Sequence, residues 1–73
     1  MQLSNIVPGT TVQVASFREA HIALKLMEFG INIGSFITVE RIAPFGGPML
    51  IQTQNGKIAL RKEEAQTLTV SQD

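Results

Sequence analysis

The chain has 73 residues, 44% of them hydrophobic, and its six lysine and arginine residues balance six aspartate and glutamate residues. A chain of this length is expected to form one small domain over residues 1–73. Zero net charge argues against a surface for nucleic acid or anionic lipid, and the absence of cysteine excludes disulfides and thiolate metal sites.

The cellular compartment is predicted from what the sequence lacks. No apolar run approaches the roughly 20 residues that a membrane-spanning helix needs, and no charged-then-apolar secretion signal opens the chain. The lack of cysteine is typical of a reducing compartment. We therefore expect a cytoplasmic protein that does not itself span a membrane.

The first elements predicted are a strand and a helix. Thr11–Ala15 alternates in hydrophobicity after a proline–glycine turn, which indicates a short strand. Ser16 and Glu19 have the S-x-x-E spacing of a helix capping box. The sequence therefore predicts a helix over about Phe17–Phe29.

The predicted helix is amphipathic. A projection at about 100° per residue places Leu26 and Met27 on the apolar half and His21 on the polar half. Leu24 lies at the seam between the two halves and is expected to be partly exposed. The apolar half should pack in the core, whereas His21 should be a solvated side chain.

Gly30 marks the end of this helix, because glycine tolerates the left-handed conformation that commonly follows a last helical turn. Ile31 follows at the position that folds back onto that turn. The apolar period then changes from 3.6 to 2, and Phe36–Ile42 alternates strictly. This change predicts a second strand, with the helix inserted between the first two strands.

Turn-forming residues divide the rest of the chain. Ala43–Pro48 contains two prolines and two glycines, so the sheet ladder must stop there. Asn55-Gly56 predicts a hairpin with a type I′ turn, in which both residues take positive φ. Lys62–Ala65 is predicted to be a charged helical turn. The remaining strands are predicted at Met49–Gln54, Lys57–Arg61 and Thr67–Val70.

Five short strands in so small a chain favour a closed or partly closed barrel, because closure removes exposed strand edges. The predicted fold class is therefore mainly β, with one α-helix. The predicted core consists of Val12, Val14, Leu26, Met27, Ile37, Val39, Ile51, Ile58, Leu60 and Leu68.

The inventory of side chains argues against enzyme chemistry. A serine nucleophile could pair only with His21, which is the sole histidine, and the serines lie in turns, at the predicted cap or at the chain end. Glu63 and Glu64 are adjacent and do not face each other on a helical turn. A ferrous site needs several converging nitrogen and oxygen ligands, typically two histidines and a carboxylate. We therefore expect no catalytic, cofactor-binding or metal-binding residues.

Three segments carry a resemblance to a known family. Leu26–Gly34 resembles the L-x-x-[ML]-G-[LI]-x-x-G signature of the ferrous iron transport protein A (FeoA) family. Ala43–Pro48 is similar to its A-P-[LF]-G-D-P loop, and Leu60–Ala65 is similar to its L-R-[KR]-x-[ED]-A segment. The match runs in order over roughly Val12 to Val70, almost the whole chain.

The resemblance implies an SH3-like barrel with the helix between the first two strands. It also implies a non-enzymatic cytoplasmic accessory of ferrous iron uptake, recruited to the inner face of the membrane. Such a protein would dock on a ferrous iron permease and its GTP-binding domain, and would support or regulate transport. Gly47 stands where the family usually has aspartate, so no role of that carboxylate carries over.

The same domain also occurs as the C-terminal module of metal-responsive repressors, so a stand-alone SH3-like interaction module is the alternative. This chain supplies none of the DNA-binding helices that such a regulator needs. A proline-recognising groove would need tryptophan or tyrosine, which are absent, and a nucleic-acid groove would need basic and stacking residues. A protein–protein adaptor remains, and a homo-oligomer is compatible with a barrel of this size.

The predicted partner-binding site is the loop after the second strand. Its prolines lower the entropy lost on binding, and its phenylalanine offers an aromatic anchor. In the alternative interpretation, the loop only turns the chain and the aromatic ring fills the end of the barrel. A second candidate lies on the outer face of the helix, either separate or part of the same patch. The loop residues are Pro44, Phe45, Gly46, Gly47 and Pro48, and the helix residues are His21 and Leu24.

Overall fold

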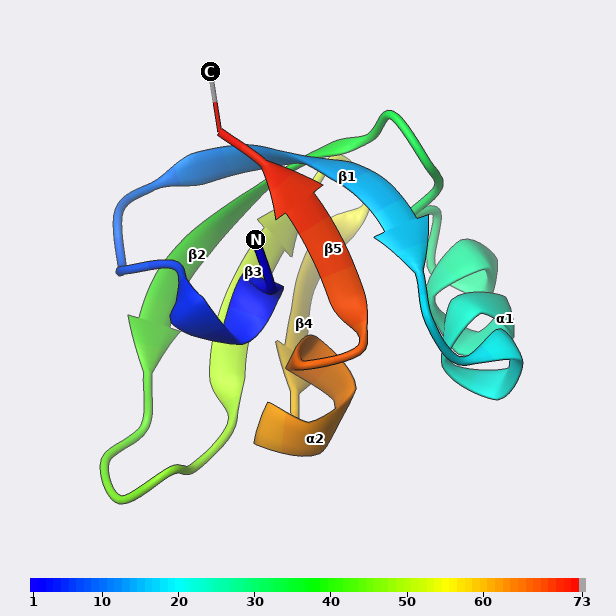
Figure 1. The fold of residues 1–73 in the computed structure, drawn as a ribbon. Coiled ribbons are helices and arrows are strands. Elements are labelled where there is room, and N and C mark those ends of the chain that lie inside the picture. The colour runs from blue at the N-terminus through cyan, green and yellow to red at the C-terminus, as the bar shows by residue number, and fades with distance from the viewer. Residues whose placement is uncertain (73) are drawn as a thin grey trace.

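The computed structural model describes residues 1–72. Five strands form one antiparallel sheet in the order β4-β3-β2-β1-β5, which curls around the core (Figure 1). The strands are β1 (Thr11–Phe17), β2 (Phe36–Ile42), β3 (Met49–Thr53), β4 (Gly56–Leu60) and β5 (Leu68–Ser71). The helical segments are the 3₁₀ turn η1 (Leu3–Asn5), α1 (Ala20–Glu28) and α2 (Lys62–Ala65).

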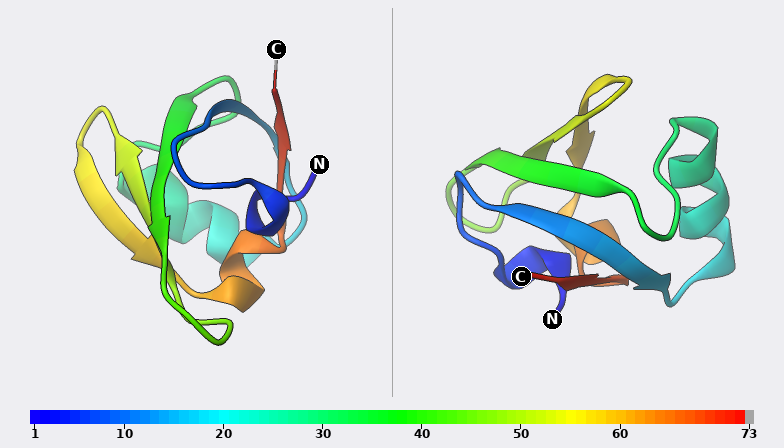
Figure 2. Two further views of the ribbon diagram at one scale, coloured as in Figure 1. Left: turned by 90° about the vertical axis from the view of Figure 1, so that its left-hand side faces the viewer. Right: turned by 90° about the horizontal axis from the view of Figure 1, so that it is seen from above.

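This architecture confirms a mainly β fold with the helix inserted between the first two strands. β1 pairs with both β2 and β5, while β4 and β5 are the two edges of the sheet. Figure 1 and the right-hand view of Figure 2 show α1 at one end of the rolled sheet. The core inside the sheet consists of Leu3, Ile6, Val12, Val14, Leu26, Ile31, Ile37, Val39, Met49, Ile51, Leu60, Ala65, Leu68 and Val70.

Two of the predicted core residues are not fully buried. Met27 is 44% exposed, and Ile58 is half-buried against the edge of the core. The helix buries only a narrow stripe, Ala23 and Leu26, beside the half-buried Ile22. Met27 lies about 100° around the helix from Leu26, which is enough to turn it into solvent. The periodicity identified the apolar face correctly but overestimated its width.

The predicted start of the helix is also wrong, because β1 continues through Phe17. Ser16 pairs with Thr69 and Phe17 with Leu68 of β5, after a register shift that follows Val14. The capping box does not form: α1 begins at Ala20, after an extended Glu19 that makes no side-chain cap hydrogen bond. Ladder hydrogen bonds and the packing of Phe17 on the core override the local capping preference.

The end of α1 has the predicted glycine stop. Gly30 has φ +93°, and its N–H donates to the Met27 carbonyl at 2.9 Å. The Ile31 N–H donates to the Leu26 carbonyl at 2.8 Å, which completes a Schellman motif. Ile31 is fully buried, so this cap also carries the chain into the core.

The hairpin between β3 and β4 is confirmed, but its turn is not type I′. Gly56 has positive φ whereas Asn55 does not. The Asn55 N–H donates to Thr53 Oγ1 at 3.1 Å, and the Asn55 side-chain amide donates to the Phe29 carbonyl at 3.0 Å. A contact with the helix end therefore fixes the conformation of Asn55, which the turn sequence alone does not reveal.

The N-terminal segment closes one edge of the sheet. The Val70 N–H donates to the Met1 carbonyl at 2.7 Å, and Gln2 bridges to Thr69. Leu3 and Ile6 are buried in the core. Neither residue is in the predicted core, because the 3₁₀ turn that holds Leu3 and ends just before Ile6 is too short to show a hydrophobic period.

We expect Leu26→Ala to lower the free energy of unfolding by about 2–5 kcal/mol, through lost transfer energy and a cavity. Leu24→Ala is the matched control, since Leu24 lies on the same helix and is 61% exposed. It should change stability by no more than about 0.5 kcal/mol. Urea denaturation measures both. Equal losses in the two variants would mean that Leu26 is not the core contact of the helix.

We expect Gly30→Ala to be strongly destabilising for two separable reasons. Positive φ disfavours any side chain at this position, and a Cβ would overlap the Asn55 amide nitrogen. In an Asn55→Ala background only the φ term remains, so Gly30→Ala should cost less there than in the parent. A double-mutant cycle by chemical denaturation measures the difference. Identical costs in both backgrounds would show that Asn55 does not approach Gly30.

Candidate functional site

Residues 43–48 form a loop of defined shape between β2 and β3. The Ala43 N–H donates to the Pro48 carbonyl at 2.9 Å, and the Gly47 N–H donates to the Pro44 carbonyl at 3.2 Å. These bonds close the loop across its base, and the prolines restrict it further. The loop projects from the barrel at the lower left of Figure 1.

Phe45 stands at the tip of this loop, and its side chain is fully exposed. The interpretation that the ring fills the end of the barrel is therefore wrong. Phe45 has φ +60° and is the sole non-glycine residue with positive φ among residues 1–72. That conformation costs about 1–2 kcal/mol for a residue with a Cβ. The tight turn that the Gly47 N–H closes onto the Pro44 carbonyl, with positive φ at both Phe45 and Gly46, accounts for the backbone. No packing within the described chain accounts for the exposed ring.

The two glycines after Phe45 have different roles. Gly46 has φ +73°, and a Cβ there would lie 3.8 Å from Cδ of Lys62, so the loop rests beside the Lys62 side chain. A Cβ on Gly47 would lie 2.7 Å from the Ala43 Cβ and 3.2 Å from the Pro44 carbonyl oxygen. A residue with a side chain, such as aspartate, would therefore not fit at position 47 unless the loop shifted.

A hollow of about 200 Å³ lies beside the loop. We call it the loop hollow. Residues from four parts of the chain meet there, namely η1, the facing ends of β2 and β3, the loop itself and α2. It is lined by Ser4, Ile42, Gly46, Gly47, Met49 and Lys62. Sequence analysis identified the two glycines, but it could not predict the other four residues because only the folded chain brings them together.

The second predicted candidate is on α1. His21 is exposed, and its Nδ1 lies 3.5 Å from Oε1 of Glu19. Leu24 is also exposed, one turn of the helix further on. His21 lines a hollow of about 280 Å³ between α1 and α2, together with Glu19, Ile22, Glu63, Glu64 and Thr67. Figures 1 and 2 show α1 and the loop at opposite ends of the molecule, so the two candidates are separate surfaces.

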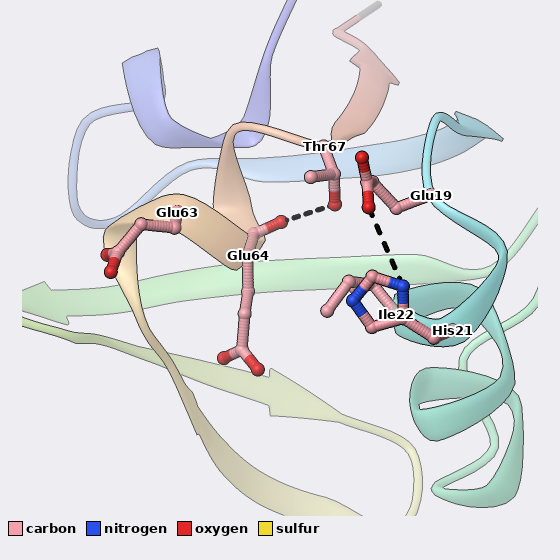
Figure 3. A pocket seen from close by; sticks show the side chains of 6 residues that line it. All are labelled: Glu19, His21, Ile22, Glu63, Glu64 and Thr67. Atoms are coloured by element: carbon pink, nitrogen blue, oxygen red, sulfur yellow. Dashed lines mark hydrogen bonds and ion pairs between the residues drawn. The ribbon is translucent and has the colours of Figure 1, made fainter.

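The acidic residues that line the hollow between α1 and α2 do not converge on one point. Figure 3 shows the Glu63 side chain turned away from His21. The Glu64 carboxylate accepts from Nζ of Lys25 at 2.6 Å and from the Arg61 N–H at 2.9 Å. Within residues 1–72, no three histidine, cysteine, aspartate or glutamate side chains are grouped so that they could hold a metal ion.

The Lys25–Glu64 pair joins α1 to α2, and sequence analysis missed it because 39 residues separate the partners. The Glu64 side chain is only 15% exposed. The hydrogen bond from the Lys25 ammonium lowers the pKa of the Glu64 carboxyl below its usual 4.5, and the Arg61 N–H contributes to the same effect, while burial opposes both. The Glu64 carboxylate is therefore occupied by an ion pair that links α1 to α2.

The FeoA domain family matches residues 1–72. The chain belongs to the FeoA family. FeoA from Chlorobium tepidum is 30% identical and superposes with a TM-score of 0.91, covering 99% of this chain and 70% of that one. FeoA from Stenotrophomonas maltophilia, solved in complex with zinc, is 32% identical with a TM-score of 0.83, covering 97% and 89%. That protein is described as an SH3 domain protein and a candidate activating factor of ferrous iron transport.

The same fold occurs outside FeoA proteins. A manganese-dependent transcriptional repressor superposes with a TM-score of 0.88 at 21% identity, covering all of this FeoA chain and 41% of the repressor. At this identity the likeness establishes the fold alone, which is an SH3-like barrel. No helix within residues 1–72 is long and apolar enough to cross a membrane.

We expect the Lys25–Glu64 pair to make stability depend on pH. Because the folded pKa of Glu64 lies below the unfolded value, the stabilisation is present above about pH 4.5 and is lost as pH falls through the folded pKa. Glu64→Gln removes this contribution. The stability gap between parent and variant should therefore be wider at about pH 7 than at about pH 3.

Thermal melts across that range measure the gap, with Glu63→Gln as the control. Glu63 is exposed and forms no ion pair with any residue between 1 and 72, so its variant should follow the parent at every pH. A constant gap for Glu64→Gln would show that the pair does not contribute to stability.

Proposed function

We propose that this FeoA protein is a non-enzymatic accessory of ferrous iron uptake that docks through the loop of residues 44–48 onto a membrane permease. The observation that carries the proposal is Phe45, a fully exposed aromatic ring on a backbone with φ +60°. Strained, exposed residues cluster at binding sites, where the strain holds a side chain ready for contact. A rigid loop with an aromatic tip has the properties of an interface anchor.

Family membership indicates the kind of partner. The Stenotrophomonas maltophilia relative is described as a candidate activating factor of ferrous iron transport. We infer the same process for this chain, with the cytoplasmic GTP-binding domain of a ferrous iron permease as the docking surface. The protein would then act at the inner face of the membrane and regulate or assemble the transporter, without hydrolysing nucleotide itself.

The required contact area extends the site beyond the loop. The folded chain exposes 4395 Å², and a standard interface covers about 800 Å² on each partner. Docking would therefore occupy roughly a fifth of the whole surface. The surroundings of the loop, including the loop hollow, belong in such a footprint. The separate surface at His21 and Leu24 would make a second contact only with a partner that reaches across the molecule.

We expect Phe45→Ala to melt like the parent but to lose binding. The exposed ring contributes no buried area, so stability should change by no more than about 0.5 kcal/mol. Loss of an interface anchor typically lowers affinity by about 2 kcal/mol or more, which is thirtyfold or more. Copurification with the permease and ferrous uptake in cells that lack the native protein measure the effect.

Phe36→Ala is the matched control, because it removes the same ring from another exposed position, at the start of β2. It should retain both binding and uptake. If Phe45→Ala behaves like the parent in both assays, the loop is not the docking site. If Leu24→Ala loses binding instead, the outer face of α1 is the site.

A further inference from the structure

We infer that the loop hollow receives one large apolar side chain of the partner, and that Lys62 at its rim pairs with a carboxylate next to that side chain. For the identity of the partner this inference rests on the proposed function. The chemistry of the partner's group follows from the residues that line the hollow and from its size.

Two of the residues that line the hollow are large and apolar, Ile42 and Met49. Met49 and Ile42 are paired neighbours at the facing ends of β3 and β2. Met49 is buried, whereas Ile42 is 39% exposed and so offers an uncovered aliphatic surface. Gly46 and Gly47 also line the hollow, and they contribute backbone atoms only. An apolar group entering the hollow would therefore replace water on aliphatic surface, which is favourable.

Lys62 is the charged group at this site. The other two lysines of the chain are already paired, Lys25 with Glu64 and Lys57 with Glu40. Lys62 forms no ion pair with any residue that the structure describes. A Cβ at Gly46 would lie 3.8 Å from Cδ of Lys62 and 3.9 Å from its Nζ, so the lysine side chain runs beside the loop and lines the hollow. An anionic group of the partner would meet this ammonium without displacing another carboxylate of residues 1–72.

The donors present favour a single carboxylate over a phosphate. The Ser4 hydroxyl, the other polar side chain of the lining, already donates to Oε1 of Gln2 at 3.3 Å. One ammonium therefore remains as the side-chain donor at the site. A phosphate dianion is usually bound by several donors or by a bidentate guanidinium, whereas one exposed carboxylate is adequately matched by one lysine.

The size of the hollow indicates an anchor residue rather than a small-molecule ligand. Its volume is about 200 Å³, below the roughly 300–1,000 Å³ of sites that enclose small molecules. Interfaces commonly seat one large side chain in a pocket of this kind. The hollow also shares two glycines with the loop that carries Phe45, so both would lie within one footprint.

The first experiment tests the hollow without the permease. The protein labelled with ¹⁵N is titrated with acetyl-Leu-Asp-amide, acetyl-Leu-Asn-amide or inorganic phosphate, and amide shifts are followed by NMR. The aspartate peptide should shift Gly46, Gly47 and Lys62, and its affinity should exceed that of the asparagine peptide by roughly threefold to tenfold. Shifts elsewhere, equal affinities, or saturable binding of phosphate alone at these residues would overturn the inference.

Three variants divide the inference into its parts. Lys62→Gln should reduce binding of the aspartate peptide to the level of the asparagine peptide, whereas Lys62→Arg should restore most of it. Ile42→Thr, which keeps the β-branched shape, should weaken both peptides equally by lowering the apolar contact. Lys57→Gln is the matched control and should change neither. Melting curves of each variant exclude a loss of fold as the cause.

The second experiment uses the permease's cytoplasmic GTP-binding domain. Lys62→Gln should weaken its binding by roughly threefold to tenfold, and Lys57→Gln should not. If the parent protein does not bind this domain, the proposed function fails, while the peptide titration still decides the inference. If Phe45→Ala abolishes binding but Lys62→Gln has no effect with either the domain or the peptides, the proposed function holds and the hollow is not the seat.

Discussion

The arrangement of helix and barrel depends on the junction at Gly30. Three segments meet there: the last turn of α1, the tip of the β3–β4 hairpin and the chain that leads into β2. The left-handed glycine turns the chain so that Ile31 enters the core. The missing Cβ leaves room for Asn55 to donate to the Phe29 carbonyl at 3.0 Å. The Asn55 side chain thus satisfies one carbonyl that the helix end leaves without a partner, and it connects the hairpin to the helix.

The rest of the helix is held by few contacts. α1 has nine residues, which is too short to be stable in isolation, and it buries little more than the stripe around Leu26. Two polar contacts, both toward its C-terminal end, therefore help to set its position: Asn55 donates to the Phe29 carbonyl, and Lys25 in the last turn pairs with Glu64. Neither contact uses the outer face of the helix or the loop at the other end of the barrel, where Leu24 and Phe45 are exposed. Those are the surfaces at which a partner can bind without disturbing the fold.

Sequence reasoning succeeded where the cause is local and failed where it is not. The period of two predicted the strands, and the prolines placed the loop between β2 and β3. The start of the helix was wrong because the pairing of Phe17 with β5 depends on residues about 50 positions away. The loop could be identified from its residues, but the exposure of Phe45 could not, since prolines and glycines also occur in loops that fold back. The helical turn at Lys62–Ala65 was predicted, but the contact of Lys62 with the loop was not, because it depends on how α2 packs in the folded chain.

The glycine at position 47 connects the shape of the loop to its proposed chemistry. A side chain there would collide with Ala43 and the Pro44 carbonyl, so the tight path that exposes Phe45 requires glycine. An aspartate at this position would also bring a carboxylate to the wall of the loop hollow, where it would compete with an external carboxylate for Lys62. With glycine at this position, Lys62 has no ion-pair partner among residues 1–72. Recognition by this loop would then depend on apolar contact and on a negative charge that the partner supplies.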